Sequence, residues 1–429
     1  MNQEHSNQFH TDTLSCGLRI ISAPSKSDVV YCGIAVDTGT RDELPEENGL
    51  AHFCEHLTFK GTQRRSSRQV INQMECVGGD LNAYTGKEET IYYTAFLKEH
   101  FQRAVELLAD IVLASTYKQA EMDKEVEVII DEIESYNDSP SELIYDEFEN
   151  LIFQGCALGK NILGEAERLR QYKSADMQRF VARNYLPQNM AFFLYGNIEP
   201  KTIRRELEKA IKRAVDSLDK DSERYQQFAN PAPETETNVT DTLPPYTPVE
   251  ITRKKDTHQA HVLIGCRSYS ARDPKHLALY LLNNMLGGPG MSSRLNLSLR
   301  EKNGLVYTVE SSMTTYTDTG VWCIYFGCDE HDIDRCRRLV AKELNKLIEK
   351  PISEKELNAA KRQIKGQIGI SYDNSENVAL SLGKTFLHYK RGRSQEELYR
   401  RIDALTAEEL HEVAKDLFRP EHLTTLIYK

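Results

Sequence analysis

Two histidines and a glutamate at helical spacing form the strongest chemical signal in this sequence. The stretch AHFCEHLTFKGT, residues 51–62, places His52 and His56 four residues apart, with Glu55 directly before the second. On a helix that begins near Asn48, the three side chains share one face of roughly 100°. Two neutral imidazoles one turn apart can bind Zn²⁺ together, and a neighbouring carboxylate can accept a proton from a metal-bound water. The motif indicates a hydrolytic zinc site, although two histidines on a solvated helix give the same pattern.

A hydrolytic zinc site needs a third protein ligand and keeps a fourth position open. The segment DKEVEVIIDEIESYNDSP, residues 123–140, predicts a helix that ends before Pro140. Glu125 and Glu132 are seven residues apart on it, with β-branched apolar residues between them, so both acids share nearly one azimuth. An ordinary solvated acidic face has the same pattern. These residues alone therefore leave the third ligand open.

The elements that must position these residues fall into two halves of the chain. The stretch NPAPETETNVTDTLPPYTPVE, residues 230–250, holds five of the 14 prolines and almost no large apolar side chains. Such composition is typical of an extended linker. We therefore expect one domain at 1–229, a linker at 230–250 and a second domain at 251–429.

The two halves also repeat each other. The stretch TIYYTAFLKEHFQRAVELLADIV (90–112) parallels WCIYFGCDEHDIDRCRRLVAKEL (322–344), and two further matches follow in order at offsets between 231 and 235 residues. Matches at a nearly constant offset indicate an internal duplication. Strand-like runs at 28–39 and 259–270 and amphipathic helices near 101–115 and 336–349 do not alternate regularly. This order predicts, for each half, an α+β sheet with helices on one face.

Composition excludes several classes of protein. The chain has 429 residues, 40% of them hydrophobic and 28% charged, and no run of eighteen apolar residues that could span a membrane. A net charge of −11 without a basic stripe argues against a nucleic-acid partner. The nine cysteines form no CxxC pair, and the first residues show no secretory signal. We therefore expect reduced thiols and a cytoplasmic location.

Three stretches together resemble a known enzyme family. NGLAHFCEHLTFKGT, GGDLNAYTGKEETIYY (78–93) and EVEVIIDEI resemble the inverzincins, the zinc metallopeptidases of the pitrilysin and mitochondrial-processing-peptidase type with an HxxEH signature. The family's third ligand is a glutamate some 75 residues beyond the second histidine, and 75 residues separate His56 from Glu132. The resemblance implies one Zn²⁺ per chain bound by His52, His56 and Glu132. It makes Glu55 the general base and Glu125 a supporting residue of the site.

The same resemblance implies the fold and the substrate contacts. The fold would be α+β, with two homologous domains, each an antiparallel-rich sheet packed against helices, facing each other across a chamber. Asn82 and Ala83 would lie on an edge strand that pairs with an extended peptide. Arg300 and Tyr307, within GGPGMSSRLNLSLREKNGLVYTV (287–309), would hydrogen-bond substrate near the cleaved bond.

Only the first half carries the metal motif. Aligning the repeats places the metal-site residues of the first half on Leu279, Leu282 and Asn283, and Glu132 on Gln367. None of these apolar or amide side chains matches its counterpart in the zinc motif. Within the motif itself, Cys54 departs from the family's usual leucine. We interpret it as a small buried packing residue, with sensitivity to bulky thiol reagents as the alternative.

These observations predict a zinc endopeptidase that hydrolyses peptides or unfolded polypeptides. The chain length resembles the branch of the family that works as dimers, so we expect a homodimer, with a heterodimer with a related subunit as the alternative. Two other functions remain open: a non-catalytic structural or scaffolding subunit, and a peptidase that selectively removes presequences.

Overall fold

The computed structural model describes residues 9–231, 243–255 and 257–429, and these form two compact α+β units. The first unit holds the described residues of Met1–Ile133, Lys160–Asp241 and Ser371–Ser394. The second holds those of Glu134–Gly159, Thr242–Ile370 and Gln395–Lys429. Residues 232–242 of the predicted linker lie outside the described residues.

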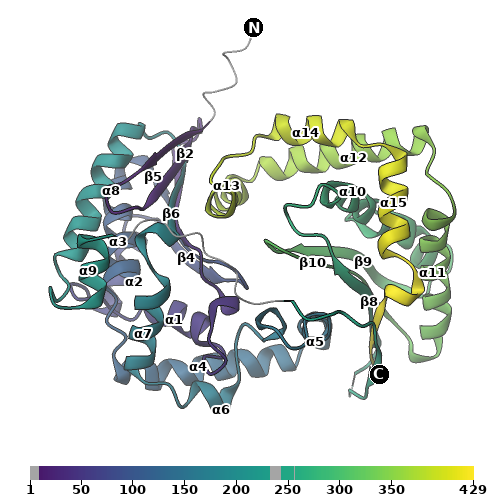
Figure 1. The fold of residues 1–429 in the computed structure, drawn as a ribbon, viewed down its shortest axis with the longest axis horizontal. Helices are drawn as coiled ribbons and strands as arrows, with labels where there is room; N and C mark the ends of the chain where they lie inside the picture. The colour runs from purple at the N-terminus through teal and green to yellow at the C-terminus, as the bar shows by residue number, and fades with distance from the viewer. Residues whose placement is uncertain (1–8, 232–242, 256) are drawn as a thin grey trace, which may run out of the picture. The chain divides into compact units, whose positions relative to one another are not determined.

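The first unit is built on a six-stranded sheet in the order β1-β2-β6-β3-β5-β4 (Figure 1). Its strands are β1 (His10–Thr13), β2 (Arg19–Ala23), β3 (Val29–Val36), β4 (Asp80–Thr85), β5 (Thr90–Leu97) and β6 (Met190–Tyr195). Neighbouring strands are antiparallel except β2 and β6, which run parallel. Strand β4 therefore forms one edge of the sheet.

Helices from the first half of the sequence supply most of this unit's core. They are α1 (Leu50–Thr58), α2 (Ser67–Glu75), α3 (Phe101–Ala114), α4 (Gln119–Asn137), α6 (Ala166–Leu169), α7 (Ser174–Asn184), α8 (Pro200–Val215) and α9 (Glu223–Ala229). Alternate residues of β3, such as Val30 and Ile34, point into this core, where they pack with Phe53 and Leu108. Packing in this core positions α1 and α4, which carry the predicted metal ligands.

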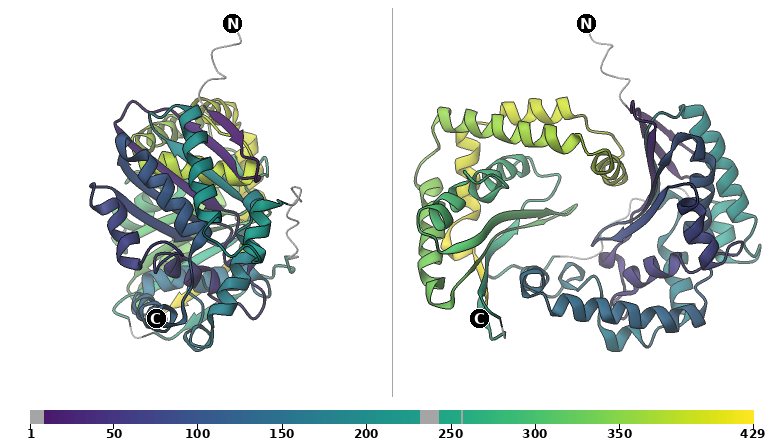
Figure 2. Two further views of the ribbon diagram at one scale, coloured as in Figure 1. Left: turned by 90° about the vertical axis from the view of Figure 1, so that its left-hand side faces the viewer. Right: turned by 180° about the vertical axis from the view of Figure 1, so that it is seen from behind.

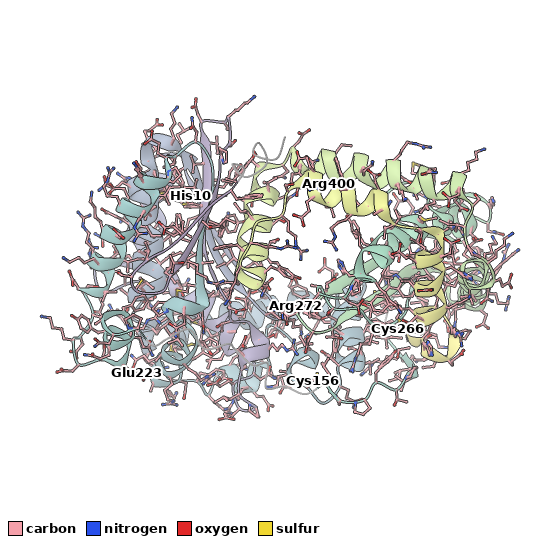
Figure 3. All side chains as sticks on the ribbon, turned by 45° about the horizontal axis from the view of Figure 1, so that its top comes forward. His10, Cys156, Glu223, Cys266, Arg272 and Arg400 are labelled. Carbon is pink, nitrogen blue, oxygen red and sulfur yellow. The ribbon has the colours of Figure 1, made fainter. Side chains whose placement is uncertain are left out.

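The second unit repeats this plan on a five-stranded sheet in the order β7-β11-β8-β10-β9. Its strands are β7 (Glu250–Arg253), β8 (Ala260–Ser268), β9 (Val306–Thr315), β10 (Gly320–Cys328) and β11 (Thr424–Tyr428). Its helices are α5 (Pro140–Ile152), α10 (His276–Gly287), α11 (Ile333–Glu349), α12 (Glu354–Tyr372), α14 (Gln395–Ala404) and α15 (Ala407–Leu417). Cys266 of β8, labelled in Figure 3, lies buried in its core. Among the described helices of both units, none combines the length and apolar character needed to cross a membrane.

Each unit is completed by one helix from the opposite half of the sequence. Helix α13 (Ser375–Tyr389) packs on the face of the first sheet opposite to α3 and α8 (Figures 1 and 2). Its Leu382 and Phe386 join a buried cluster with Ile21 and Phe193. In the second unit, α5 covers the corresponding face of the sheet, and its side chains cluster with strand residues of β8 and β10.

The expectation of helices on one face only is therefore wrong. The physical reason can be read in β6, MAFFLY, where residues on both sides of the strand are apolar and buried. A strand that is apolar on both sides needs cover on both faces of its sheet. The exchange also makes the two units discontinuous in sequence, unlike the contiguous domains expected on either side of 230–250.

The exchange is reciprocal and follows the duplication. Helix α4 begins at residue 119 and α12 at residue 354, and the exchanged helices α5 and α13 begin at 140 and 375. Both pairs have an offset of 235 residues, within the range found for the sequence repeats. Each half of the chain thus contributes the equivalent helix to the other half's sheet.

Candidate active site

The N-terminus of α1 is fixed by a glycine and a buried carboxylate. Gly49 precedes the helix with φ +82°, and a Cβ there would lie 2.7 Å from the Cα of Gly164. A residue with a side chain fits neither this backbone conformation nor this approach. The Glu43 carboxylate accepts hydrogen bonds from the backbone N–H groups of Gly49 (3.1 Å) and Ala51 (2.9 Å). It satisfies two amides at the start of the helix and so holds α1 in place.

The structure brings the three predicted metal ligands together. Nε2 of His52 lies 3.9 Å from Oε2 of Glu132, and Nε2 of His56 lies 3.6 Å from the same oxygen. One ligand atom from each residue lies within 4.8 Å of the others. These distances exceed those of hydrogen bonds. They approach the separation of about 3.4 Å between two ligands of one tetrahedral Zn²⁺ with bonds of about 2.0–2.1 Å, so the residues fit this ion.

The protonation state of His52 suits a metal ligand. Burial, followed by the nearby charge of His56, lowers the pKa of His52 to about 3. The ring is therefore neutral at neutral pH, as metal binding requires. The buried Nδ1 of His52 has no hydrogen-bond partner among the described residues, and the ring packs edge-on against that of His56, with 4.6 Å between the ring centroids.

Glu125 orients the second histidine. Its Oε1 lies 3.0 Å from Nδ1 of His56, and its Oε2 accepts from Nζ of Lys60 at 2.6 Å. Burial raises the pKa of Glu125, but the hydrogen bonds from His56 and Lys60 outweigh it and the pKa is lowered overall. The ionised carboxylate fixes the ring so that its Nε2 points toward Glu132. Lys60 was not predicted from the sequence, although it lies only four residues beyond His56 and just past the end of α1.

Glu55, the predicted general base, is held by a threonine that was not predicted from the sequence either. Its side chain is mostly buried, and its Oε2 accepts a hydrogen bond of 2.6 Å from the hydroxyl of Thr85. Burial raises the pKa of Glu55, while the Thr85 hydrogen bond opposes that shift. A raised pKa makes a carboxylate a stronger base, which suits a group that accepts a proton and later releases it. Thr85 is the last residue of β4, and only the folded hairpin reveals its position.

Strand β4 also carries Asn82 and Ala83, at the edge of the first sheet. On one side they pair with Tyr93 and Tyr92 of β5, and no described strand pairs with the other side. The Asn82 amide donates to Asp80 at 2.8 Å. An edge of this kind offers backbone groups to which an extended peptide can add as a further strand.

Arg300 and Tyr307 lie close to each other in the second unit. Arg300 is part of a π-helical turn (Asn296–Glu301), and Tyr307 is on β9, an edge strand of the second sheet. The guanidinium carbon lies 5.4 Å from the centroid of the tyrosine ring, a cation–π contact, and Tyr307 is 79% exposed. Their position relative to the histidines of the first unit stays a prediction.

The second half has side chains of a different kind at the positions equivalent to His52, Glu55 and His56. Leu279 and Leu282, both on α10, are buried in the core of the second unit. The Asn283 side-chain oxygen accepts hydrogen bonds from the Ser311 hydroxyl (2.5 Å) and from Nε1 of Trp322 (3.1 Å). These positions serve packing and hydrogen bonding within the second unit.

Cys54 lies on the face of α1 that points away from the metal ligands. It is fully buried, and its thiol is 3.6 Å from the hydroxyl of Tyr117. Burial, the largest influence, raises the pKa of the thiol to about 11. A buried thiol that stays protonated is a poor nucleophile, which favours the packing interpretation.

Two α+β units and an HxxEH cluster are typical of a two-domain metallopeptidase. The comparisons with known proteins agree with this class. Residues 19–166 match the family model described as insulinase, peptidase family M16, and residues 172–364 match the M16 inactive domain. The chain is 31% identical to an uncharacterized zinc protease, YmxG, of Bacillus subtilis over 422 residues, 97% of each protein. The chain belongs to peptidase family M16.

A further relative supports this assignment, and two solved structures have the same fold. The chain is 30% identical to the human mitochondrial-processing peptidase subunit beta over 410 residues, covering 93% of this chain and 80% of that protein. The fold is similar to that of a protease from Helicobacter pylori, with a TM-score of 0.88 and 21% identity over 99% of both chains. The M16 inactive domain from Pseudomonas fluorescens gives a TM-score of 0.86 at 17% identity. The predicted α+β fold of two related domains is confirmed.

Proposed function

We propose that this chain is a zinc-dependent endopeptidase that hydrolyses peptides or unfolded polypeptides. The observation that carries the proposal is the cluster of His52, His56 and Glu132. Glu55 lies beside the two histidines on α1. The names of relatives, which include zinc proteases, support zinc as the metal. The family resemblance suggests one ion per chain, since the second half has leucine and asparagine at the equivalent positions.

Each side chain then has a distinct task. A zinc ion bound by His52, His56 and Glu132 would supply an acidified water and polarise the scissile carbonyl. Glu55 accepts the proton from the attacking water and returns it to the leaving amine. The free edge of β4, at Asn82 and Ala83, binds the substrate backbone as an added strand.

Three supporting residues complete the proposal. Glu125 keeps the His56 ring oriented, as its hydrogen bond supports. Arg300 and Tyr307 donate hydrogen bonds to the carbonyl oxygen as negative charge develops on it, because a guanidinium and a phenol are suitable donors.

The assembly and the compartment are part of the same proposal. We propose a homodimer, because each chain carries both the metal ligands and the Arg300–Tyr307 pair, with a heterodimer with a related subunit as the alternative. The expected partner is a peptide or an unfolded polypeptide rather than nucleic acid or a membrane. The cysteine pattern supports the cytoplasm, where thiols remain reduced.

Two alternatives have specific support. The similarity to a mitochondrial-processing peptidase subunit favours selective presequence removal as the second candidate function. A non-catalytic structural or scaffolding subunit is the third, and the family model of residues 172–364 is itself named inactive. The assembled ligand set and the buried base at Glu55 favour catalysis over this last alternative.

Glu55→Gln tests the proposal directly. The amide keeps the shape of the side chain but cannot accept the proton, so peptide cleavage should fall by about 10²–10⁴-fold while bound zinc stays unchanged. Cleavage of a mixed peptide library and the metal content by mass spectrometry would be measured together. Glu75→Gln, an exposed position on α2, is the matched control. Undiminished cleavage by the Glu55 variant would contradict the proposal, as would full activity after chelation of the metal.

A further inference from the structure

The turn between β4 and β5 is tied to the body of the first unit at nearly every residue. Within residues 86–89, the Gly86 N–H donates to the Glu89 carbonyl at 2.7 Å and closes the turn. The Arg41 N–H donates to the carbonyl of Lys87 at 2.8 Å, and the Arg41 guanidinium binds Glu88 at 2.7 Å. Connecting segments usually run over the surface and are mobile, whereas Lys87 and Glu89 of this turn are buried.

The last residue of the turn, Glu89, binds α13. Its carboxylate is almost fully buried, forms an ion pair with Lys384 and lies 3.2 Å from Nε2 of His388. The other ring nitrogen of His388 lies 3.5 Å from Asp37. Burial alone would raise the pKa of Glu89 and lower that of His388. The contacts with His388 and Lys384 outweigh burial and lower the pKa of Glu89. The contact with Glu89 and the nearby charges of Asp37 and Glu88 likewise raise the pKa of His388. Helix α13 therefore presents an ammonium group and an imidazole ring to the turn.

The turn directly continues the strand that holds the base. Thr85 pairs with Thr90 across the hairpin and donates its hydroxyl to Glu55 at 2.6 Å. The Thr90 hydroxyl in turn donates to the carbonyl of Thr38 at 2.9 Å. A shift of the turn would therefore move the Thr85 hydroxyl, and a displacement of a few tenths of an ångström is enough to weaken a hydrogen bond of this length.

We propose that Glu89, held by Lys384 and His388 of α13, is a positioning residue for Glu55 and acts through the turn and Thr85. The inference rests on the proposed function, because it assigns a role toward the general base. It makes a helix encoded some 330 residues after Glu55 part of the support for the site. Anchoring from a second element keeps a reacting group in a productive geometry.

Helix α13 also supplies a control for the effect of its general attachment to the first sheet. Glu376, near the other end of α13, accepts a hydrogen bond of 2.7 Å from the hydroxyl of Tyr93 on β5 and makes no contact with the turn that the structure records. Loss of that bond weakens the attachment of α13 without releasing Glu89. Effects specific to Glu89 and His388 therefore separate positioning from attachment.

The experiment compares Glu89→Gln, His388→Gln and Glu376→Gln in the full chain with zinc bound. We expect the first two to lower kcat about 3- to 10-fold with KM nearly unchanged, and the third to keep the wild-type kcat. Thr85→Val removes the hydroxyl that transmits the effect. In that background, Glu89→Gln should lower kcat by less than 2-fold, because the two changes interrupt one path. An equal loss in both backgrounds, or a full kcat for Glu89→Gln, would overturn the inference.

A second measurement is independent of catalysis. Hydrogen exchange of the segment 80–90, followed by mass spectrometry, should be faster in Glu89→Gln and His388→Gln than in Glu376→Gln. If the wild type binds zinc but cleaves no peptide, the proposed function fails, and this measurement still decides whether Glu89 holds the strand. Exchange at the wild-type rate in Glu89→Gln would overturn the inference even if the enzyme is active.

Discussion

At the scale of single residues, the zinc affinity of the proposed metal site is expected to depend on a contact outside the three proposed ligands. The Glu125 carboxylate orients the His56 ring and is itself held by Lys60. Glu125→Gln keeps the size of the side chain but removes its charge. We expect the affinity for zinc to fall about 10- to 100-fold, as is typical when an orienting partner of a ligand is lost.

Competition with a chromophoric chelator would measure this affinity. Glu127→Gln is the matched control, because Glu127 is an exposed glutamate on the same helix that pairs with Arg170. An unchanged affinity in Glu125→Gln would show that the His56 ring is positioned without it.

The residues of the site differ in how far the sequence could predict them. His52, Glu55 and His56 are linked by the period of one helix, and Glu132 by a family spacing, so a linear pattern contains them. Thr85 reaches Glu55 only because a hairpin brings β4 beside α1. No local period encodes that approach, and a threonine at the end of a strand has many ordinary roles.

At the scale of elements, the packing of α13 on the first sheet is tight enough to exclude a methyl group. A Cβ at Gly383 would lie 2.5 Å from the ring of Phe193. Alanine favours a helix over glycine by about 1 kcal/mol, but overpacking a tight contact costs about 1–3 kcal/mol. We expect Gly383→Ala to lower the free energy of unfolding by about 1 kcal/mol.

The control is a glycine in α12, the helix that precedes α13 in the sequence. At Gly366 of α12 a Cβ would meet no atom within 4 Å, so Gly366→Ala should raise stability by up to about 1 kcal/mol. Denaturant unfolding of both variants would test the opposite signs. A stabilised Gly383→Ala variant would mean that Phe193 moves aside at little cost.

The sequence predicted several individual elements but not the cover of the sheets. The amphipathic stretch at 101–115 corresponds to α3, and the strand-like run at 28–39 to β3. The partner of α13 could not be predicted, because its apolar residues identify a buried face without identifying the sheet it covers. Only the offset of 235 residues between α5 and α13, read from the structure, relates the two exchanged helices.

At the scale of the whole molecule, the reciprocal exchange makes the two halves depend on each other for folding. A fragment of residues 1–250 lacks α13, so Ile21 and Phe193 of the first sheet lose their cover. The same fragment contains α5 without the sheet that buries Leu143 and Phe148. We expect it to bind a hydrophobic dye and to lose cooperative unfolding, because both apolar faces are exposed.

Calorimetry and dye fluorescence would test the fragment against the full chain. A matched variant of the fragment, in which a flexible linker joins it to residues 371–394, should recover a cooperative transition. A fragment of 1–250 that unfolds as cooperatively as the full chain would contradict the dependence.

The exchange of helices also determines when the first unit can be finished during synthesis. Its last strand, β6, ends at Tyr195, but α13 ends at Tyr389, and at about 5–20 residues per second the ribosome needs roughly 10–40 s to make the chain between them. During that interval all six strands of the first sheet have been made, but one face of the sheet lacks the cover that α13 provides. The nascent chain would need protection by a chaperone then, and a ribosome stalled before residue 389 would present the most aggregation-prone form of this protein.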